Sequence, residues 1–431
     1  MLRLLVGLSV SEAVPLYGGI NDLGYYFMDV HLGSPPQRFS AIVDTGSEGL
    51  AVTCTPCASC GKNHMDPFFN PRISSSFSQQ CGSSHLRKSE CVFEKRYLEG
   101  SVLKGRVYTD VVGVDDSSSS RRAIPFGCIE TETKLFTNQK ANGIMGLSPV
   151  PKTAFLYADT GIAAFSLCLS QNGGEAEFFS SFQRPNTTTV NLGYRDSHYV
   201  VEPTQIAIQA VNGTQTWSSE NSTSLVTEWT GTQVLIDSGS TITYFKDSFY
   251  RVLETEILDS LISVKESLTR DKSGPALCWN HENSVNIRPF LPVISISLKS
   301  SGGDIHVPFA NYTVTDTVKG DKWKTCLTVA SNSGLGRTDL GASWLLGRNV
   351  TLSTKDGWMT IDETECPQHL LTSRAAVEPL PGQLEWDSDS WPLFAVLALM
   401  LTVAACLLVL VKRSVVAPAR YSLAPIQEVD E

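Results

Sequence analysis

AIVDTGSEGL (residues 41–50) is the stretch that decides how the chain is interpreted, because two hydrophobic residues lead directly into Asp44-Thr45-Gly46-Ser47. By itself it is ambiguous. Short polar side chains beside a glycine also form ordinary turns, in which they bond to their own backbone. The alternative is that Asp44 is half of a catalytic pair, which requires a second carboxylate on a matching turn elsewhere in the chain.

A matching turn is present. FSAIVDTGS, ending at Ser47, is repeated as TQVLIDSGS, ending at Ser240, so Asp237 occupies the place of Asp44. A second pair of motifs, ANGIMGL (141–147) and SWLLGR (343–348), places two hydrophobic residues before a glycine after each Asp motif. This order predicts two related lobes, each contributing one carboxylate.

Two carboxylates that face one another across a lobe interface do not both ionise cheaply, so one keeps a proton and the other stays anionic. The anionic group takes a proton from a bound water, and the protonated group polarises a substrate carbonyl. The remaining residues of both motifs support this pair. Glycines allow the tight turns and hydroxyls bond to the carboxylates or across the interface: Thr45, Gly46, Ser47, Ser238, Gly239 and Ser240.

The rest of the chain is rich in short runs of β-branched and aromatic residues separated by Gly, Pro, Asn and Ser, such as YYFMDVHL, TQIAIQAV and VISISL. This pattern predicts a mostly β protein. One stretch, residues 246–268, has apolar residues at helical spacing, and Asp247 or Ser248 is placed to cap its start.

With 431 residues, of which 42 % are hydrophobic, the chain can bury two cores or one large bilobal core. Its formal net charge is −10, from 34 basic and 44 acidic residues. This balance argues against a nucleic-acid partner, which needs a basic face.

Residues 391–411 (WPLFAVLALMLTVAACLLVLV) carry no charge and are about as long as a helix that crosses a membrane, roughly 20 residues. A buried core helix, the alternative, would need caps and polar interruptions. Lys412 and Arg413 follow directly, so the positive-inside rule predicts that the tail 412–431 is cytosolic and that everything earlier is lumenal or extracellular. Residues 1–14 form only a weak signal peptide or residual leader.

A lumenal body fits the cysteines and the glycosylation sequons. Ten of the eleven cysteines precede the span, and Cys406 lies within it. We expect disulfides in an oxidising compartment. Cys54, Cys57, Cys60 and His64 also have a spacing seen in zinc or iron–sulfur sites, but we expect no metal and no cofactor. Five N-x-S/T sequons precede the span, at Asn186, Asn212, Asn221, Asn311 and Asn349.

Both Asp motifs and both hydrophobic-Gly motifs, together with YYFMDVHLGSPPQ before the first of them, resemble the pepsin-type aspartic protease family over roughly residues 20–366. The resemblance implies that Asp44 and Asp237 are the catalytic pair. It also implies a bilobal, mostly β fold with pseudo-twofold lobes at 15–187 and 188–372, a stem at 373–390 and a monomeric catalytic unit.

KRYLEGSVLKGRVYTD (95–110) resembles the hairpin, or flap, that closes over substrate in this family, which makes Tyr97 the flap tyrosine and Gly100 part of its turn. This chain departs from the family at one point. Many members carry a tryptophan near the position of Ala51, where it partners the flap tyrosine, but this chain has EGLAVTC (48–54) there and no tryptophan. The flap of this chain is therefore expected to be supported differently.

The cysteine-rich insert at 54–91 resembles that of nepenthesin-like enzymes, and most closely that of the plasmepsin V group of apicomplexan proteases. In that group a flap glutamate and a glutamine hold an arginine three residues before the cut, and these map onto Glu99 and Gln139. Taken singly, either residue is more simply read as a solvated surface side chain. A carboxylate and an amide oxygen do suit a guanidinium, which has only donors.

The resemblance also bears on the disulfides. It implies the pairs Cys278 with Cys326 and Cys168 with Cys366. The remaining six cysteines all precede these pairs, with Cys128 added to the five of the insert, and their connectivity is left open: Cys54, Cys57, Cys60, Cys81, Cys91 and Cys128.

These observations together predict a single-pass, membrane-anchored aspartic endopeptidase of the endoplasmic reticulum or Golgi. Its substrates would be secreted or exported proteins, cut after an Arg-x-Leu type motif. Two alternatives remain at this stage. One is a surface sheddase or nepenthesin-like protease of broad specificity, and the other is an inactive binding protein on the same fold.

Overall fold

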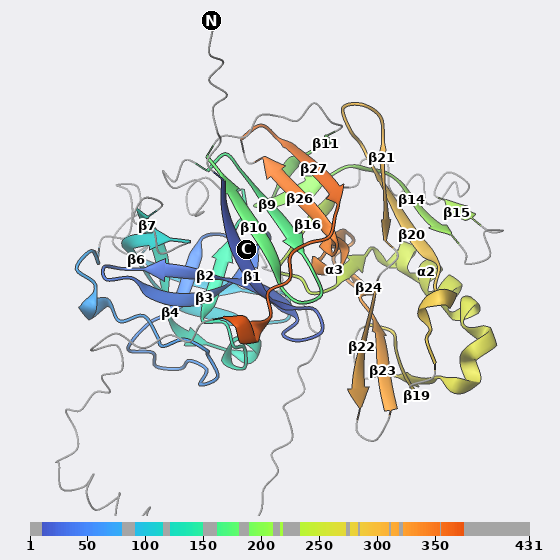
Figure 1. Ribbon diagram of the computed structural model, residues 1–431, viewed down its shortest axis with the longest axis horizontal. Helices are drawn as coiled ribbons and strands as arrows, with labels where there is room; N and C mark the ends of the chain where they lie inside the picture. The colour runs from blue at the N-terminus through green and yellow to red at the C-terminus, as the bar shows by residue number, and fades with distance from the viewer. Residues whose placement is uncertain are drawn as a thin grey trace, which may run out of the picture.

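The computed structural model describes residues 11–79, 91–114, 121–149, 162–180, 189–209, 216–218, 233–272, 276–282, 285–309, 312–318, 322–353 and 355–374. Strands predominate in this part of the chain, as the sequence predicts. Two lobes lie on either side of a central group of strands (Figure 1).

The N-terminal lobe is built from strands that continue one large sheet, in the order β1-β2-β3-β8-β4-β7-β6-β5. Their bounds are β1 Ser11–Gly19, β2 Tyr25–Leu32, β3 Gln37–Asp44, β4 Leu50–Thr53, β5 Val92–Arg96, β6 Val102–Gly113, β7 Arg122–Glu132 and β8 Gly143–Gly146. Two short 3-10 helices, η1 Pro71–Ile73 and η3 Lys134–Thr137, connect them.

Three smaller sheets and the longer helices form the C-terminal lobe. One sheet has the order β12-β13-β16-β25-β17-β24, and the others are β15-β14-β20-β21 and β18-β19-β23-β22. The first comprises β12 Gly193–Arg195, β13 His198–Val201, β16 Val234–Ile236, β25 Thr338–Leu340, β17 Thr243–Phe245 and β24 Val329–Ser331. The second comprises β14 Pro203–Gln209, β15 Thr216–Ser218, β20 Val293–Leu298 and β21 Ile305–Phe309, and the third β18 Thr269–Asp271, β19 Cys278–Glu282, β22 Thr313–Val318 and β23 Lys322–Leu327.

The strands that carry the two aspartates have the same pairing in both lobes. In the N-terminal lobe β3 runs parallel to β8, which is also antiparallel to β4. In the C-terminal lobe β16 runs parallel to β25, which is also antiparallel to β17. Each aspartate therefore leaves a buried strand at an equivalent point, as the internal repeat predicts.

The second hydrophobic-Gly motif was assigned to the wrong residues. The counterpart of Gly146 is Gly341 rather than Gly347. A Cβ at Gly146 would meet the carbonyls of Ser47 and Gly49, and a Cβ at Gly341 would meet those of Ser240 and Ile242, the equivalent positions. Trp344 and Leu345, whose hydrophobic side chains before Gly347 resemble the motif, belong to the short helix α3 Ala342–Leu345.

Strands from both halves of the chain share the central sheet, in the order β11-β27-β26-β9-β10-β1. They are β9 Ala164–Leu169, β10 Gly174–Phe179, β11 Val190–Asn191, β26 Arg348–Ser353 and β27 Trp358–Glu363. Strand β1 pairs with β10 from Ser11 onward, and Val14 is 3 % exposed. The folded body thus includes residues 11–14, which were predicted to belong to a leader, because β1 fills the place between β10 and β2 in this sheet.

The predicted helix is shorter than 246–268. Helix α2 spans Asp247–Ser260 and buries Phe249, Tyr250, Leu253 and Ile257. Residues Ile262–Ser267 continue as the 3-10 helix η5, which buries no residue. The α-helix therefore ends where its apolar stripe ends. Lys246 is the N-cap residue, without a side-chain capping bond, so neither Asp247 nor Ser248 caps the helix.

The cysteines form disulfides. Cys168 pairs with Cys366 and Cys278 with Cys326, as the resemblance implies. Within the group left open, Cys54 pairs with Cys128 and Cys57 with Cys60, and Cys91 is also disulfide-bonded. Cys81 lies outside the described residues. These bonds occupy the cysteine thiols that the metal alternative required.

Other predictions fall outside the described residues. Among the residues that are described, no helix is long and apolar enough to cross a membrane, and the predicted span 391–411 is not among them. The sequons at Asn186, Asn212, Asn221 and Asn311 lie outside them too. Asn349 is half-buried in β26, between β9 and β27, and its glycosylation stays a prediction.

The last described segment crosses back from the C-terminal to the N-terminal lobe. It includes the 3-10 helix η7 Leu371–Ser373 and ends at Arg374, whereas the 3-10 helix η6 Arg288–Phe290 precedes β20. Figure 1 shows this orange-red end of the chain beside the blue N-terminal strands. Arg374 donates to Asp29 at 2.8 Å and to both oxygens of Asp66 at 2.8 and 2.9 Å. Its guanidinium also lies over the ring of Phe27.

Replacing Arg374 by Ala should lower the free energy of unfolding by about 3 kcal/mol, because the buried carboxylate of Asp66 and the partly buried carboxylate of Asp29 lose their nearest cationic partner. The measurement is urea unfolding with the disulfides intact. Arg195→Ala is the matched control, since its ion pair with Asp196 is exposed and worth little. An effect of Arg374→Ala no larger than that of the control would contradict the assignment.

Candidate active site

The two predicted aspartates have the same hydrogen-bond environment. Asp44 accepts a bond from the Gly46 N–H at 2.8 Å, and Asp237 accepts one from the Gly239 N–H at 3.0 Å. Their second oxygens accept bonds from the hydroxyls of Ser47 and Ser240, the latter at 2.6 Å. Both side chains are buried, with residue exposures of 1 % and 3 %. The serines therefore act as the sequence predicts.

The glycines of the two motifs leave room for the opposite carboxylate. A Cβ at Gly46 would lie 2.7 Å from Oδ1 of Asp237, and a Cβ at Gly239 would overlap the carboxylate of Asp44. Each glycine is thus in contact with the aspartate of the other lobe. The structure brings the two carboxylates together across the interface.

Crossed hydrogen bonds between the lobes fix this approach. The Thr45 hydroxyl accepts from the Ser238 N–H at 2.9 Å, and the Ser238 hydroxyl accepts from the Thr45 N–H at 3.0 Å. Each hydroxyl then donates to the opposite strand, Thr45 to the Ile236 carbonyl and Ser238 to the Val43 carbonyl. Every donor in this set has an acceptor, so the interface is rigid as well as buried.

Burial governs the ionisation of the pair. Burial, followed by the charge of Asp237, raises the pKa of Asp44 to about 7. Burial also raises the pKa of Asp237, against the hydrogen bonds from Ser240 and Gly239. Two such groups in contact hold one proton between them over a wide pH range. That is the state in which one carboxylate activates water while the other donates a hydrogen bond to a carbonyl.

A third carboxylate, which the sequence analysis missed, lies behind this pair. Asp339 in β25 is fully buried. It accepts from Asn332 Nδ2 at 2.9 Å and forms an ion pair with Arg337 at 3.0 Å. Its charge contributes to raising the pKa of Asp237. The signal available in the sequence was an aspartate in the place of the hydrophobic residue Ile144 of the first lobe.

Tyr244, opposite Asp339 in the β17–β25 pair, was missed as well. Its hydroxyl is buried and makes no hydrogen bond with the described residues. Burial raises its pKa above the ordinary value, and the charges of Asp237, Asp339 and Glu99 add to this effect. The C-terminal lobe thus places a hydroxyl within electrostatic reach of both the aspartate pair and the flap.

The hairpin that the sequence predicts to be the flap is formed by β5 and β6. The Tyr97 N–H bonds to the Ser101 carbonyl, and the Gly100 N–H bonds to the Tyr97 carbonyl. Gly100 has φ +84°, a conformation that favours glycine. Tyr97 is 2 % exposed and packs on Phe136 of η3, with ring centroids 5.0 Å apart. Phe136 is therefore the aromatic partner of Tyr97 in this chain, which has Ala51 near the position of the family's tryptophan.

Glu99 and Gln139 present shielded acceptors. Both carboxylate oxygens of Glu99 and Oε1 of Gln139 are inaccessible to solvent, and none makes a hydrogen bond of standard geometry with the described residues. The Ser101 hydroxyl and the backbone N–H groups of Glu99 and Ser101 nevertheless lie close enough to the Glu99 carboxylate to interact with it. Burial raises the pKa of Glu99, while Ser101 and Lys134 partly counteract it. Gln139 is 8 % exposed, which excludes the solvated surface position that the simpler interpretation assumed.

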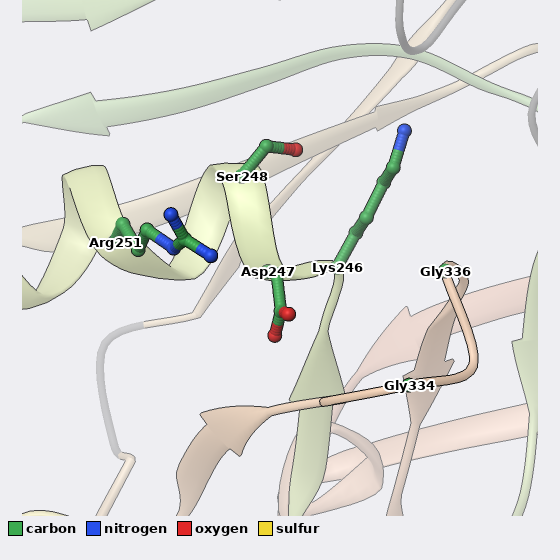
Figure 2. Close-up of a pocket in the computed structure, with 6 residues that line it drawn as sticks. All are labelled: Lys246, Asp247, Ser248, Arg251, Gly334 and Gly336. Carbon is green, nitrogen blue, oxygen red and sulfur yellow. The ribbon is translucent and has the colours of Figure 1, made fainter.

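A separate hollow of about 410 Å³ lies at the start of α2. Figure 2 shows Lys246, Ser248 and Arg251 beside the loop that carries Gly334 and Gly336. None of its lining residues belongs to the aspartate pair or the flap. Within the described part of the chain, no group of His, Cys, Asp and Glu side chains is arranged to hold a metal ion.

A two-lobed β fold with paired, buried aspartates at its interface is the architecture of an aspartic protease. The chain matches the eukaryotic aspartyl protease family over residues 25–353 and belongs to it. It is 28 % identical over 347 residues to aspartic proteinase nepenthesin-2 of Nepenthes gracilis. The aligned region covers 76 % of this chain and 74 % of that protein. The activity that these matches support is that of an aspartic endopeptidase.

Two apicomplexan proteins are more similar over shorter stretches. Plasmepsin V of Plasmodium falciparum is 34 % identical over 179 residues, which are 37 % of this chain and 30 % of that protein. Aspartic protease 5 of Toxoplasma gondii is 32 % identical over 209 residues, which are 39 % of this chain and 21 % of that protein. Both matches thus cover less than a third of the relative's length.

Asp44→Asn should abolish peptide hydrolysis and stabilise the fold more at pH 8 than at pH 4. The raised pKa of Asp44 means that its contribution to stability is present below about pH 4 and is lost as the pH rises through about 7. The amide avoids that loss. Melting temperatures of variant and wild type at both pH values test this. An equal difference at both would contradict the raised pKa.

Asp339→Asn should shift the pH–rate profile of peptide cleavage toward lower pH. Removing a negative charge near Asp237 makes its ionised form less costly, so its pKa falls. The profile of kcat/KM against pH is the measurement. Asp304→Asn is the control, because Asp304 is exposed in the C-terminal lobe. A shift toward higher pH, or none beyond the control, would contradict this role.

Proposed function

We propose that this chain is a membrane-anchored aspartic endopeptidase of the secretory pathway that cleaves secreted or exported proteins after an Arg-x-Leu type motif. In this proposal Asp44 and Asp237 are the catalytic pair, Tyr97 and Gly100 belong to the closing flap, and Glu99 and Gln139 receive the arginine. The span 391–411 anchors the protein with its catalytic body in the lumen.

The observation that carries the specificity is the set of three shielded acceptor oxygens on Glu99 and Gln139. A buried acceptor without a donor costs about 1–3 kcal/mol. A guanidinium has five donors and no acceptor, so a substrate arginine would satisfy all three oxygens and balance the charge of Glu99. The ammonium of lysine is a compact, strongly hydrated charge and fits such a pocket less well.

The chemistry follows from the environment of the aspartate pair. With one proton between them, the anionic member removes a proton from a water held in the cleft. The protonated member donates a hydrogen bond to the scissile carbonyl as charge develops on its oxygen. The turn N–H groups of Gly46 and Gly239 and the hydroxyls of Ser47 and Ser240 keep both carboxylates aligned through these steps.

The observation that favours the second candidate, a nepenthesin-like protease of broad specificity, is the extent of the matches. Nepenthesin-2 aligns with 76 % of this chain, whereas plasmepsin V aligns with 37 %. Such an enzyme would accept many hydrophobic sites and ignore the arginine. The two candidates therefore differ in a property that peptides can measure.

Peptides that carry Arg, Lys or Ala three residues before the cut separate these candidates. Arginine should exceed lysine in kcat/KM by about 10- to 100-fold, the equivalent of one or two charge-assisted hydrogen bonds. Glu99→Gln should reduce this ratio toward one. The matched control is Glu94→Gln, because Glu94 is a partly exposed glutamate on the same hairpin. A wild-type ratio near one would support the broad-specificity protease instead.

A further inference from the structure

We infer that residues 57–66 of the cysteine-rich insert position the specificity segment, defined here as residues 134–141, and that the buried His64–Glu132 pair is the main contact. The inference rests on the proposed function, because it assigns a role in arginine selection to residues that do not touch the substrate. His64 and Glu132 are positioning residues in this account.

Both ring nitrogens of His64 are engaged. Nε2 lies 2.9 Å from Oε2 of Glu132, and Nδ1 lies 2.8 Å from the Ala141 carbonyl. The two side chains are each 2 % exposed. A carbonyl only accepts hydrogen bonds, so Nδ1 carries a proton, and the contact with Glu132 then requires one further proton shared by the pair. His64 thus connects the end of β7 with the end of the specificity segment.

The backbone around His64 contacts both the end of β7 and the specificity segment. The Glu132 N–H bonds to the Ser59 carbonyl at 2.7 Å, and the Gly61 N–H bonds to Oε2 of Glu132 at 2.8 Å. Beyond His64, the Met65 N–H bonds to the Lys140 carbonyl at 2.8 Å. The Cys57–Cys60 disulfide closes the turn that makes the first of these contacts.

Gly61 adds a steric contact that involves no charge. A Cβ at this position would overlap the backbone of Thr137, the last residue of η3. The insert and η3 are therefore packed backbone to backbone. Any side chain at position 61 must displace the segment.

The specificity segment carries the groups on which the proposed pocket depends. Phe136 packs on Tyr97 of the flap, and Lys134 donates to the Glu99 carbonyl at 3.2 Å. Gln139 supplies one of the shielded acceptors. A displacement of the segment would move Gln139 relative to Glu99, whereas the aspartate pair is held by separate contacts between the lobes. The insert should therefore affect selection of arginine more than the chemical step.

Three variants test this inference in the full-length protein: His64→Gln, Glu132→Gln and Gly61→Ala. The substrates are the arginine and lysine peptides described above, with kcat and KM measured for each. Glu132→Gln keeps the shape and removes the charge, and Gly61→Ala moves the segment without changing any charge. His306→Gln and Glu130→Gln are the controls, since His306 is exposed in the C-terminal lobe and the Glu130 side chain is 36 % exposed on the same strand as Glu132.

The expected result is a fall of about tenfold in the arginine-to-lysine ratio of kcat/KM. It should arise mainly from a higher KM for the arginine peptide, with kcat for the lysine peptide nearly unchanged and both controls like wild type. An unchanged ratio in folded variants overturns the inference and leaves the proposed function standing. Loss of folding in all three variants also overturns the inference, because the contacts would then serve the stability of the fold. A wild-type ratio near one overturns the proposed function and the inference together.

Discussion

The crossed hydrogen bonds between Thr45 and Ser238 are the constraint on which the site depends. They join two turns that are far apart in the sequence, and each hydroxyl also donates to the carbonyl of a strand in the other lobe. This network fixes the distance between the lobes at the point where Asp44 and Asp237 leave their strands. The glycines beside them then allow each carboxylate to enter the space of the opposite turn.

Bringing two carboxylates together in a buried place determines their chemistry. Neither group is easily ionised alone, and repulsion makes ionisation of both harder still, so the pair retains a proton. Asp339 places a further buried charge behind Asp237, although Arg337 and Asn332 partly compensate it. Around this rigid centre the flap and the specificity segment belong to the N-terminal lobe, supported by the insert and by the returning chain at Arg374.

The sequence predicted the aspartate pair well because each motif is local. An aspartate, a small hydroxyl residue and a glycine follow a buried strand and form the same turn in each lobe. The prediction failed where similar patterns compete. Leu345-Leu346-Gly347 resembled the hydrophobic-Gly motif, but the true counterpart, Asp339-Leu340-Gly341, contains an acid in a buried strand. The roles of Phe136 and Arg374 could not be found by pattern, because their partners are distant in the chain and the contacts depend on tertiary packing. His64 stood out only by a metal-type spacing with the cysteines, and its contacts with Glu132 and Ala141 likewise depend on tertiary packing.

The most direct test of the central claim is a pH titration of the carboxyl carbons of Asp44 and Asp237 by 13C NMR. The account predicts that the pair keeps one proton well above the ordinary aspartate pKa of about 4, with coupled titration curves that change together toward neutral pH. Two independent titrations near pH 4 would contradict it, since they would mean that the carboxylates are neither buried together nor able to divide the acid and base roles.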